Sequence, residues 1–234
     1  MAKQTKNKKP TVHRNNSDVK IHRYLIAFPV IAFFIKMITM VNVQAGGWLG
    51  ADGENYLKGV DGLLKDGFFS SEGLLTYWPA GYPLLIWPFA AISITKFIYL
   101  LSILNSLFFA YSTYYLTKSL RKTNLAYLAF TASLLISFNP TLSLGSLTIG
   151  YETPVASCLM MALGVAIRGL VDGSNIKINQ RQILYVGLWF GLASFMQPRF
   201  ILIGAVFILI FCIFTTKSKN RIRLLAIVTC EYSR

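Results

Sequence analysis

The chain has 234 residues, of which 54% are hydrophobic and only 14% are charged. This composition is too apolar for an ordinary soluble domain and is typical of helices that have lipid as their solvent. A formal net charge of +14 would suit a nucleic-acid-binding protein, but the placement of the charges argues against nucleic acid as a partner. The sequence therefore predicts an integral membrane protein surrounded by membrane lipid.

Six stretches of the chain are candidates for membrane crossing. A hydrocarbon core of about 30 Å needs roughly 20 mostly apolar residues in a helix. The predicted spans are residues 24–43, 97–117, 125–144, 154–170, 183–196 and 200–216. The fifth is short, which predicts a tilted or buried helix. We therefore expect an all-α fold: a polytopic transmembrane helix bundle with about six spanning helices.

Lysine and arginine residues gather before the first predicted span and then after every second span along the chain. Residues 1–23, 118–122, 168–181 and 217–223 contain 17 of the 23. Positively charged residues stay on the cytoplasmic side, so six crossings from a cytoplasmic N-terminus place all four clusters on that side. Residues 44–79, on the opposite side, contain five of the nine acids. We expect a multi-pass protein of the plasma or inner membrane.

The sequence divides into three regions. Residues 1–23 form a basic cytoplasmic tail, which either lies near anionic headgroups or serves only as a topology signal. Residues 24–216 form the transmembrane region, with an outer loop at 44–96. Residues 217–234 combine a basic cytoplasmic segment with the apolar start of a further helix, which we expect to be truncated.

Two short helices are predicted in the outer loop. Residues 56–65 carry apolar side chains at roughly 3.6-residue spacing, which predicts an amphipathic helix on the membrane surface. Residues 80–95 are apolar, but Pro83 and Pro88 interrupt or kink a helix, which predicts an interfacial or re-entrant half-helix. The alternative is a full span, which would move the basic cluster 118–122 to the outer side, against the charge rule. Aromatic side chains of this segment suit the headgroup level of the membrane: Trp78, Tyr82 and Trp87.

Two acids follow the first predicted span on the non-cytoplasmic side. Asp52 and Glu54 lie in the segment Gly50-Ala51-Asp52-Gly53-Glu54-Asn55-Tyr56. A carboxylate at the membrane edge can stay ionised and still face a lipid-linked substrate, a location that suits a general base. The alternative is that these acids only solvate a loop.

Two more charged residues face the same predicted side. Glu152 is the only acid between Gly73 and Gly169, and an acid beside the membrane is a candidate functional group. It also fits an ordinary first-turn acid of a helix. Arg199 lies between two apolar spans against the charge rule, and its guanidinium suits phosphate. Snorkelling to the interface is the alternative for Arg199.

The remaining polar residues give weaker signals. Lys36, inside the first predicted span, is interpreted as a side chain that snorkels to the interface or as a sign of a small shift in the register of the span, with a buried partner as the alternative. Three cysteines lie in apolar stretches without metal-ligand spacing, so no metal site is predicted from them: Cys158, Cys212 and Cys230.

The order of these segments resembles the polytopic GT-C glycosyltransferases, the class that includes protein mannosyltransferases and aminoarabinose transferases. The resemblance covers most of residues 24–216. It rests on the acidic segment 51–56, the segment Tyr77-Trp78-Pro79-Ala80-Gly81-Tyr82-Pro83-Leu84-Leu85, Asn139-Pro140, the segment 151–154 with its acid, and the segment 191–199.

The resemblance implies transfer of a sugar from a polyprenyl-phosphate donor to an acceptor on the non-cytoplasmic face, with inversion at the anomeric carbon. Asp52 would be the general base, and Glu54 is a second candidate because many relatives have an adjacent acidic pair. Arg199 would hold the donor phosphate, and Glu152 would position the acceptor or a divalent cation. Tyr82 would bind substrate as part of its motif.

Two other classes of function are open. A transporter or lipid-handling protein would bind an anionic substrate with the same residues, and the helix breaks near Pro83 and Pro88 suit it. That class predicts charged residues near mid-membrane, which the spans lack apart from Lys36. A noncatalytic membrane assembly subunit is the other class, because members of the GT-C family are considerably longer.

Overall fold

The part of the chain that the computed structural model describes is helical. It comprises residues 16–42, 52–67, 79–93, 96–123, 126–171 and 180–215, and contains no strand, which confirms the predicted all-α class. The helices are α1 (Asn16–Asn42), α2 (Gly53–Asp66), α3 (Gly81–Ile92), α4 (Phe97–Leu120), α5 (Ala126–Ser137), α6 (Pro140–Gly145), α7 (Glu152–Val171), α8 (Gln180–Met196) and α9 (Phe200–Thr215). Residues 1–15 of the predicted tail and the segment 217–234 lie outside the described residues.

Three stretches are long and apolar enough to cross a membrane, and they agree with three predicted spans: Ile21–Asn42, Phe97–Leu120 and Glu152–Leu170. The other three predicted spans correspond to shorter helices, namely α5 with α6, α8 and α9. The described residues therefore show an all-helical fold with three candidate membrane-spanning helices.

The helix predicted over residues 125–144 is interrupted near its middle. α5 ends at Ser137 and α6 begins at Pro140. Proline has no backbone N–H to donate to the preceding turn. Asn139 caps the new helix, because its side-chain oxygen accepts a hydrogen bond of 2.9 Å from the Leu142 N–H. The Asn139-Pro140 pair thus starts a second helix.

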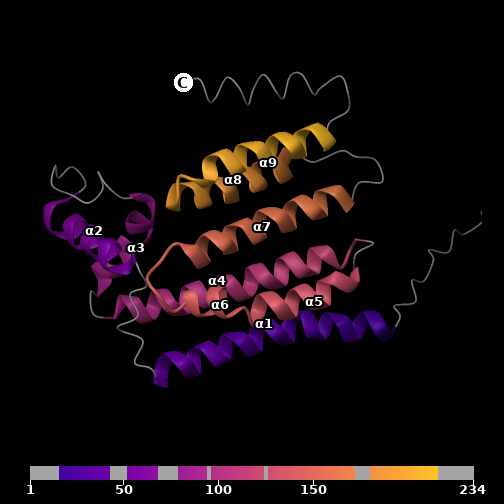
Figure 1. The fold of residues 1–234 in the computed structure, drawn as a ribbon, viewed down its shortest axis with the longest axis horizontal. Helices are drawn as coiled ribbons and strands as arrows, with labels where there is room; N and C mark the ends of the chain where they lie inside the picture. Colours follow the sequence, from indigo (N-terminus) through magenta and orange to yellow (C-terminus); the bar gives the residue numbers. More distant parts are fainter. Residues whose placement is uncertain are drawn as a thin grey trace, which may run out of the picture.

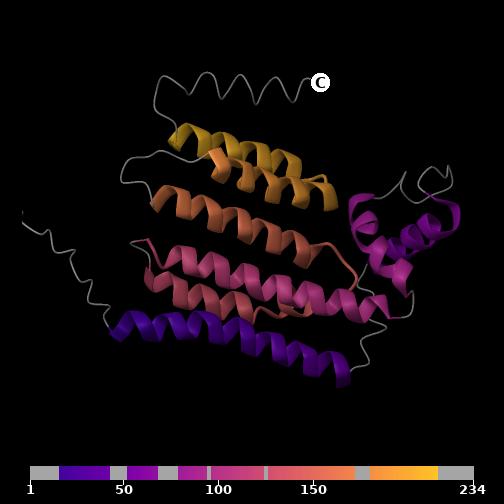
Figure 2. The same ribbon diagram turned by 180° about the vertical axis from the view of Figure 1, so that it is seen from behind.

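The long helices lie side by side, with α2 and α3 at one end of them (Figures 1 and 2). α4 packs against α1, α5 and α7, and α8 packs between α7 and α9. The end with α2, α3 and the start of α7 carries acids, and we call it the acid end: Asp52, Glu54, Asp61 and Glu152. The opposite end, the basic end, carries Lys118, Arg121, Arg168 and Arg181.

Both short helices predicted in the outer loop are present. α2 buries Tyr56 and Val60 in a cluster that also contains Tyr82 and Ile86 of α3. α3 ends at Ile92, before α4 begins at Phe97, so the two are separate helices. Trp78 lies outside the described residues.

Small polar residues join α4 to the loop that precedes α7. The Ser102 hydroxyl donates to the Leu147 carbonyl at 3.2 Å, and the hydroxyl oxygens of Ser106 and Ser146 are 2.9 Å apart. Small residues allow close approach of helices that have no hydrophobic drive to associate in lipid. These contacts hold the loop that leads to Glu152 against α4.

The prediction that Lys36 snorkels to the interface is wrong. Its side chain is 2% exposed, and Nζ lies 4.8 Å from the centre of the Phe109 ring of α4. Nζ has no hydrogen-bond partner among the described residues. The reason is that Lys36 is on the side of α1 that faces α4, whereas Phe34, Ile35 and Ile38 are exposed.

Candidate functional site

Asp52 and Glu54 lie at the start of α2, in different surroundings. Asp52 is half-buried and occupies the N-cap position, yet its side chain caps no backbone N–H of α2. Instead its backbone carbonyl accepts hydrogen bonds from the N–H groups of Asn55 and Tyr56. Glu54 is exposed in the first turn. The Asp52 carboxylate is therefore not used to start the helix.

Three tyrosines form an aromatic cluster next to Asp52. The centre of the Tyr56 ring is 5.0 Å from that of Tyr82 and 6.1 Å from that of Tyr151, both in edge-to-face geometry. Tyr56 and Tyr82 are buried, and Tyr151 is half-buried. The cluster joins α2 and α3 to the loop before α7, which carries Glu152 at the first helical position.

Tyr82 and Glu152 meet at Gly150. The Gly150 N–H donates to the Tyr82 hydroxyl at 3.1 Å. A Cβ atom at position 150 would collide with the Glu152 carboxylate, so the Glu152 side chain lies back over this glycine. The absence of a side chain at Gly150 thus allows the carboxylate and the tyrosine hydroxyl to approach the same backbone segment.

The pKa values of two tyrosines in this cluster are raised. Burial raises the pKa of Tyr56, and Tyr151, Asp52 and Glu152 add to the shift, so both carboxylates lie within electrostatic reach of this hydroxyl. Burial also raises the pKa of Tyr82, against the opposing effects of the hydrogen bond from the Gly150 N–H and of the nearby Asn105 amide. Both hydroxyls therefore stay protonated at neutral pH, as hydrogen-bonding groups rather than bases.

The turn with Arg199 lies at the same end of the molecule. A Cβ atom at Gly81, the first residue of α3, would collide with the backbone of Phe195 near the end of α8, so these backbones are in direct contact. Arg199 follows in the turn between α8 and α9 and is exposed. Among the described residues no ion pair joins Arg199 to Asp52 or Glu152.

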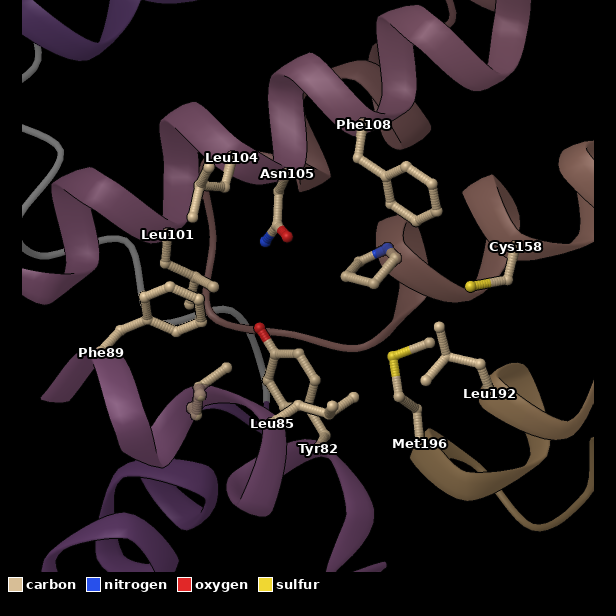
Figure 3. A pocket seen from close by; sticks show the side chains of 12 residues that line it. Tyr82, Leu85, Phe89, Leu101, Leu104, Asn105, Phe108, Cys158, Leu192 and Met196 are labelled. Carbon is tan, nitrogen blue, oxygen red and sulfur yellow. The ribbon is translucent and has the colours of Figure 1, made fainter. Parts of the chain in front are cut away.

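A cavity of about 230 Å³ lies between α3, α4, α7 and α8 (Figure 3). Its walls are almost entirely apolar, with Tyr82 and Asn105 as the polar side chains. Figure 3 shows the Asn105 amide and the Tyr82 hydroxyl directed into the same space. The other walls come from Leu85, Ile86, Phe89, Leu101, Leu104, Phe108, Pro154, Cys158, Leu192 and Met196.

The residues that the structure describes include no group of three or more His, Cys, Asp or Glu side chains that could hold a metal ion. Cys158 is buried, in agreement with its interpretation as an apolar residue. The described residues therefore provide no further acidic, histidine or cysteine ligands to hold a divalent cation together with Glu152. The role of Glu152 in binding a cation stays a prediction.

No protein-family model, curated protein or solved structure matches this chain.

Among the predicted site residues, Asp52, Tyr82 and Glu152 lie around the tyrosine cluster, and Arg199 lies at the same end without an ion pair to either acid. Glu54 is exposed outside the cluster. The sequence reasoning missed Asn105. The sequence feature that could have revealed Asn105 is the presence of an amide side chain within the apolar helix α4. Polar side chains in such a helix face other helices or a cavity rather than lipid.

Proposed function

We propose that the chain is a membrane glycosyltransferase, or its catalytic part, that transfers a sugar from a polyprenyl-phosphate donor to an acceptor on the non-cytoplasmic face. The observation that carries this proposal is the gathering of Asp52 and Glu152 around one tyrosine cluster, directly beside an apolar cavity. A lipid-linked sugar needs this combination, because its reacting head is polar and its carrier chain is apolar.

In the proposed reaction Asp52 accepts the proton of the acceptor hydroxyl as the new bond forms between that oxygen and the anomeric carbon. The bond from the anomeric carbon to the phosphate oxygen breaks, and the polyprenyl phosphate leaves with the electron pair. General-base assistance of this kind contributes about 10²–10⁴-fold to a rate. Arg199 would neutralise the leaving phosphate, and Glu152 would position the acceptor.

The proposal includes a topology of six crossings with a cytoplasmic N-terminus. Lys118 and Arg168 lie in the last turns of α4 and α7, at the basic end. The positive-inside rule assigns that end to the cytoplasm. The acid end then faces outward, with α2 and α3 as interfacial helices, and the lipid-linked donor reaches it from the outer leaflet.

The test compares substitutions of two nearby acids, Asp52 and Asp61, in the full-length chain. Each protein is reconstituted in liposomes, and sugar transfer is measured with polyprenyl-phosphate mannose and with other polyprenyl-phosphate hexoses as donors. Asp52→Asn should lower sugar transfer by at least 100-fold. The matched control is Asp61→Asn in α2, because the Asp61 carboxylate pairs with Lys65 at 2.6 Å on the exposed surface. Equal transfer by Asp52→Asn and the wild type, with both variants folded, would refute the assignment of Asp52.

One observation favours a second candidate, a transporter or lipid-handling protein. That class predicts a charge inside the bundle, and Lys36 is buried there. It predicts that liposomes with the protein move an anionic lipid between leaflets without any sugar donor, and that Lys36→Met stops this movement. A flux that needs no donor and depends on Lys36 would favour it over the enzyme.

A further inference from the structure

The cavity beside the tyrosine cluster extends from the acid end into the bundle. Its α4 wall runs from Leu101 to Phe108, and seven residues of helix rise about 10 Å. The α7 wall runs from Pro154, two residues beyond Glu152, to Cys158. The cavity therefore starts beside the candidate catalytic carboxylates and continues between apolar helices.

The cavity volume and lining favour an apolar chain as the occupant. The cavity volume of about 230 Å³ is the volume that roughly eight water molecules occupy in liquid water, at about 30 Å³ each. A buried water needs two to four polar partners, and Tyr82 and Asn105 are the polar side chains of the lining. Such walls suit a lipid chain, which the membrane supplies at high local concentration.

Asn105 is the unusual residue of this wall. Its side chain is 8% exposed, and Nδ2 has no hydrogen-bond partner among the residues that the structure describes. An amide N–H that is buried without a partner is unfavourable, and this one is directed into the cavity beside the Tyr82 hydroxyl. An occupant with an acceptor oxygen at this point would satisfy it.

We propose that Asn105 is a substrate-binding residue: its amide donates a hydrogen bond to the ester oxygen that joins the apolar chain of a lipid to its head group, while the chain fills the cavity. The amide lies in the cavity wall beside the Tyr82 hydroxyl, which is also bonded to the Gly150 N–H close to Glu152, and this position carries the assignment. It rests on the proposed function only in treating the bound lipid as a substrate.

An oxygen ester on an apolar chain could come from a polyprenyl phosphate or from a glycerophospholipid, so the test has an arm for each. Purified full-length protein in detergent is titrated with polyprenyl monophosphate, phosphatidylglycerol and squalene, which has no oxygen, and retention is measured by native mass spectrometry. Asn105→Leu, which replaces the amide by an apolar side chain of similar size, should weaken retention of an oxygen ester about tenfold. It should leave squalene unchanged.

Two more variants keep the result interpretable. Ser137→Ala removes a buried hydroxyl of α5 that has no partner among the described residues and does not line the cavity, so retention should not change. Leu192→Trp should fill the cavity and weaken all three probes while Asn105 stays in place. Retention of both oxygen esters at wild-type strength in Asn105→Leu and in Leu192→Trp would overturn the inference.

The outcomes also separate this inference from the proposed function. Retention of polyprenyl monophosphate that depends on Asn105 supports both, and in a transfer assay Asn105→Leu should then raise the donor KM more than it lowers kcat. Retention of phosphatidylglycerol alone, again dependent on Asn105, supports the cavity inference and argues against the polyprenyl-phosphate donor.

Discussion

The acid end and the basic end of the bundle use tyrosine in two different ways. At the basic end, the Arg168 guanidinium lies 4.0 Å from the centre of the Tyr115 ring, and its Nε donates to the Ser119 hydroxyl at 3.0 Å. Lys118 Nζ lies 5.1 Å from the Tyr114 ring. The aromatic faces there stabilise positive charges directly.

At the acid end the tyrosines pack on one another instead. The Tyr82 hydroxyl accepts a hydrogen bond from a backbone N–H, not from a charged group. Among the described residues, neither Asp52 nor Glu152 has an ion-pair or hydrogen-bond partner for its carboxylate. Lys118 and Arg168 at the basic end are therefore stabilised by side chains of the chain itself, whereas the carboxylates of Asp52 and Glu152 at the acid end are left for a group from outside it.

The largest expected effect tests the backbone contact that assembles the acid end. Gly81→Ala places a methyl group against the Phe195 backbone, which cannot move as a side chain can. We expect a loss of about 3 kcal/mol in the free energy of unfolding and loss of sugar transfer. Thermal unfolding in detergent and the transfer assay measure the two effects.

The matched control for this substitution is Gly62→Ala in α2, where an added Cβ meets nothing within 4 Å. We expect it to stabilise the helix by about 0.5–1 kcal/mol. If the two alanine variants unfolded at the same temperature, the direct contact of α3 with α8 would be refuted.

Two glycine substitutions test whether the acid end or the part of the bundle around Arg168 is needed for sugar transfer. Gly150→Ala should push the Glu152 carboxylate away from Tyr82. Gly164→Ala at the other end places a Cβ 2.6 Å from the Tyr115 ring, which must then move together with Arg168. Gly164→Ala should cost about 1–2 kcal/mol of stability, whereas Gly150→Ala should cost less, because the Glu152 carboxylate is the mobile end of a flexible side chain.

Only Gly150→Ala should also lower sugar transfer, by about tenfold, when transfer is measured per folded molecule. The reverse pattern, with transfer lost in Gly164→Ala and kept in Gly150→Ala, would move the functional end of the molecule from the acids to the basic cluster.

The smallest expected effect concerns the charge between the two ends. Lys36→Met removes an ammonium group that is buried without a hydrogen-bond partner among the described residues, and keeps most of the apolar stem. Desolvation of such an ion costs several kcal/mol, and the contact with Phe109 returns about 2 kcal/mol. We therefore expect a net stabilisation of about 1 kcal/mol, seen as a higher unfolding temperature. A destabilised variant would instead indicate an anionic partner for Lys36.

Much of the fold follows from the sequence because the apolar stretches, and the residues that interrupt them, are local features of the sequence. The Asn139-Pro140 pair shows both the strength and the limit of such signals. It was part of a predicted span, yet the missing N–H of Pro140 and the capping side chain of Asn139 divide that span into α5 and α6.

The sequence could not predict the rotation of each helix about its axis, which decides the side that faces the bundle. α4 is apolar over most of its length, so its pattern does not tell which side faces the bundle, and Asn105 could not be assigned to a cavity. Lys36 was misinterpreted for the same reason, because its burial depends on which side of α1 meets Phe109. The gathering of Asp52 and Glu152 depends on contacts across the whole chain, which no local pattern contains.

The break between α5 and α6 separates two parts of the bundle that are held in different ways. α6 and the residues after it are bonded to α4 and α7 through the pair Ser106 and Ser146 and through the Thr153 hydroxyl, which donates to the Leu142 carbonyl at 3.0 Å. No hydrogen bond runs across the Asn139-Pro140 step into the preceding turn through the proline nitrogen. α6 and the segment that leads to Glu152 are therefore tied together and to α4 by side-chain hydrogen bonds, whereas α5 is held by its packing against α1 and α4.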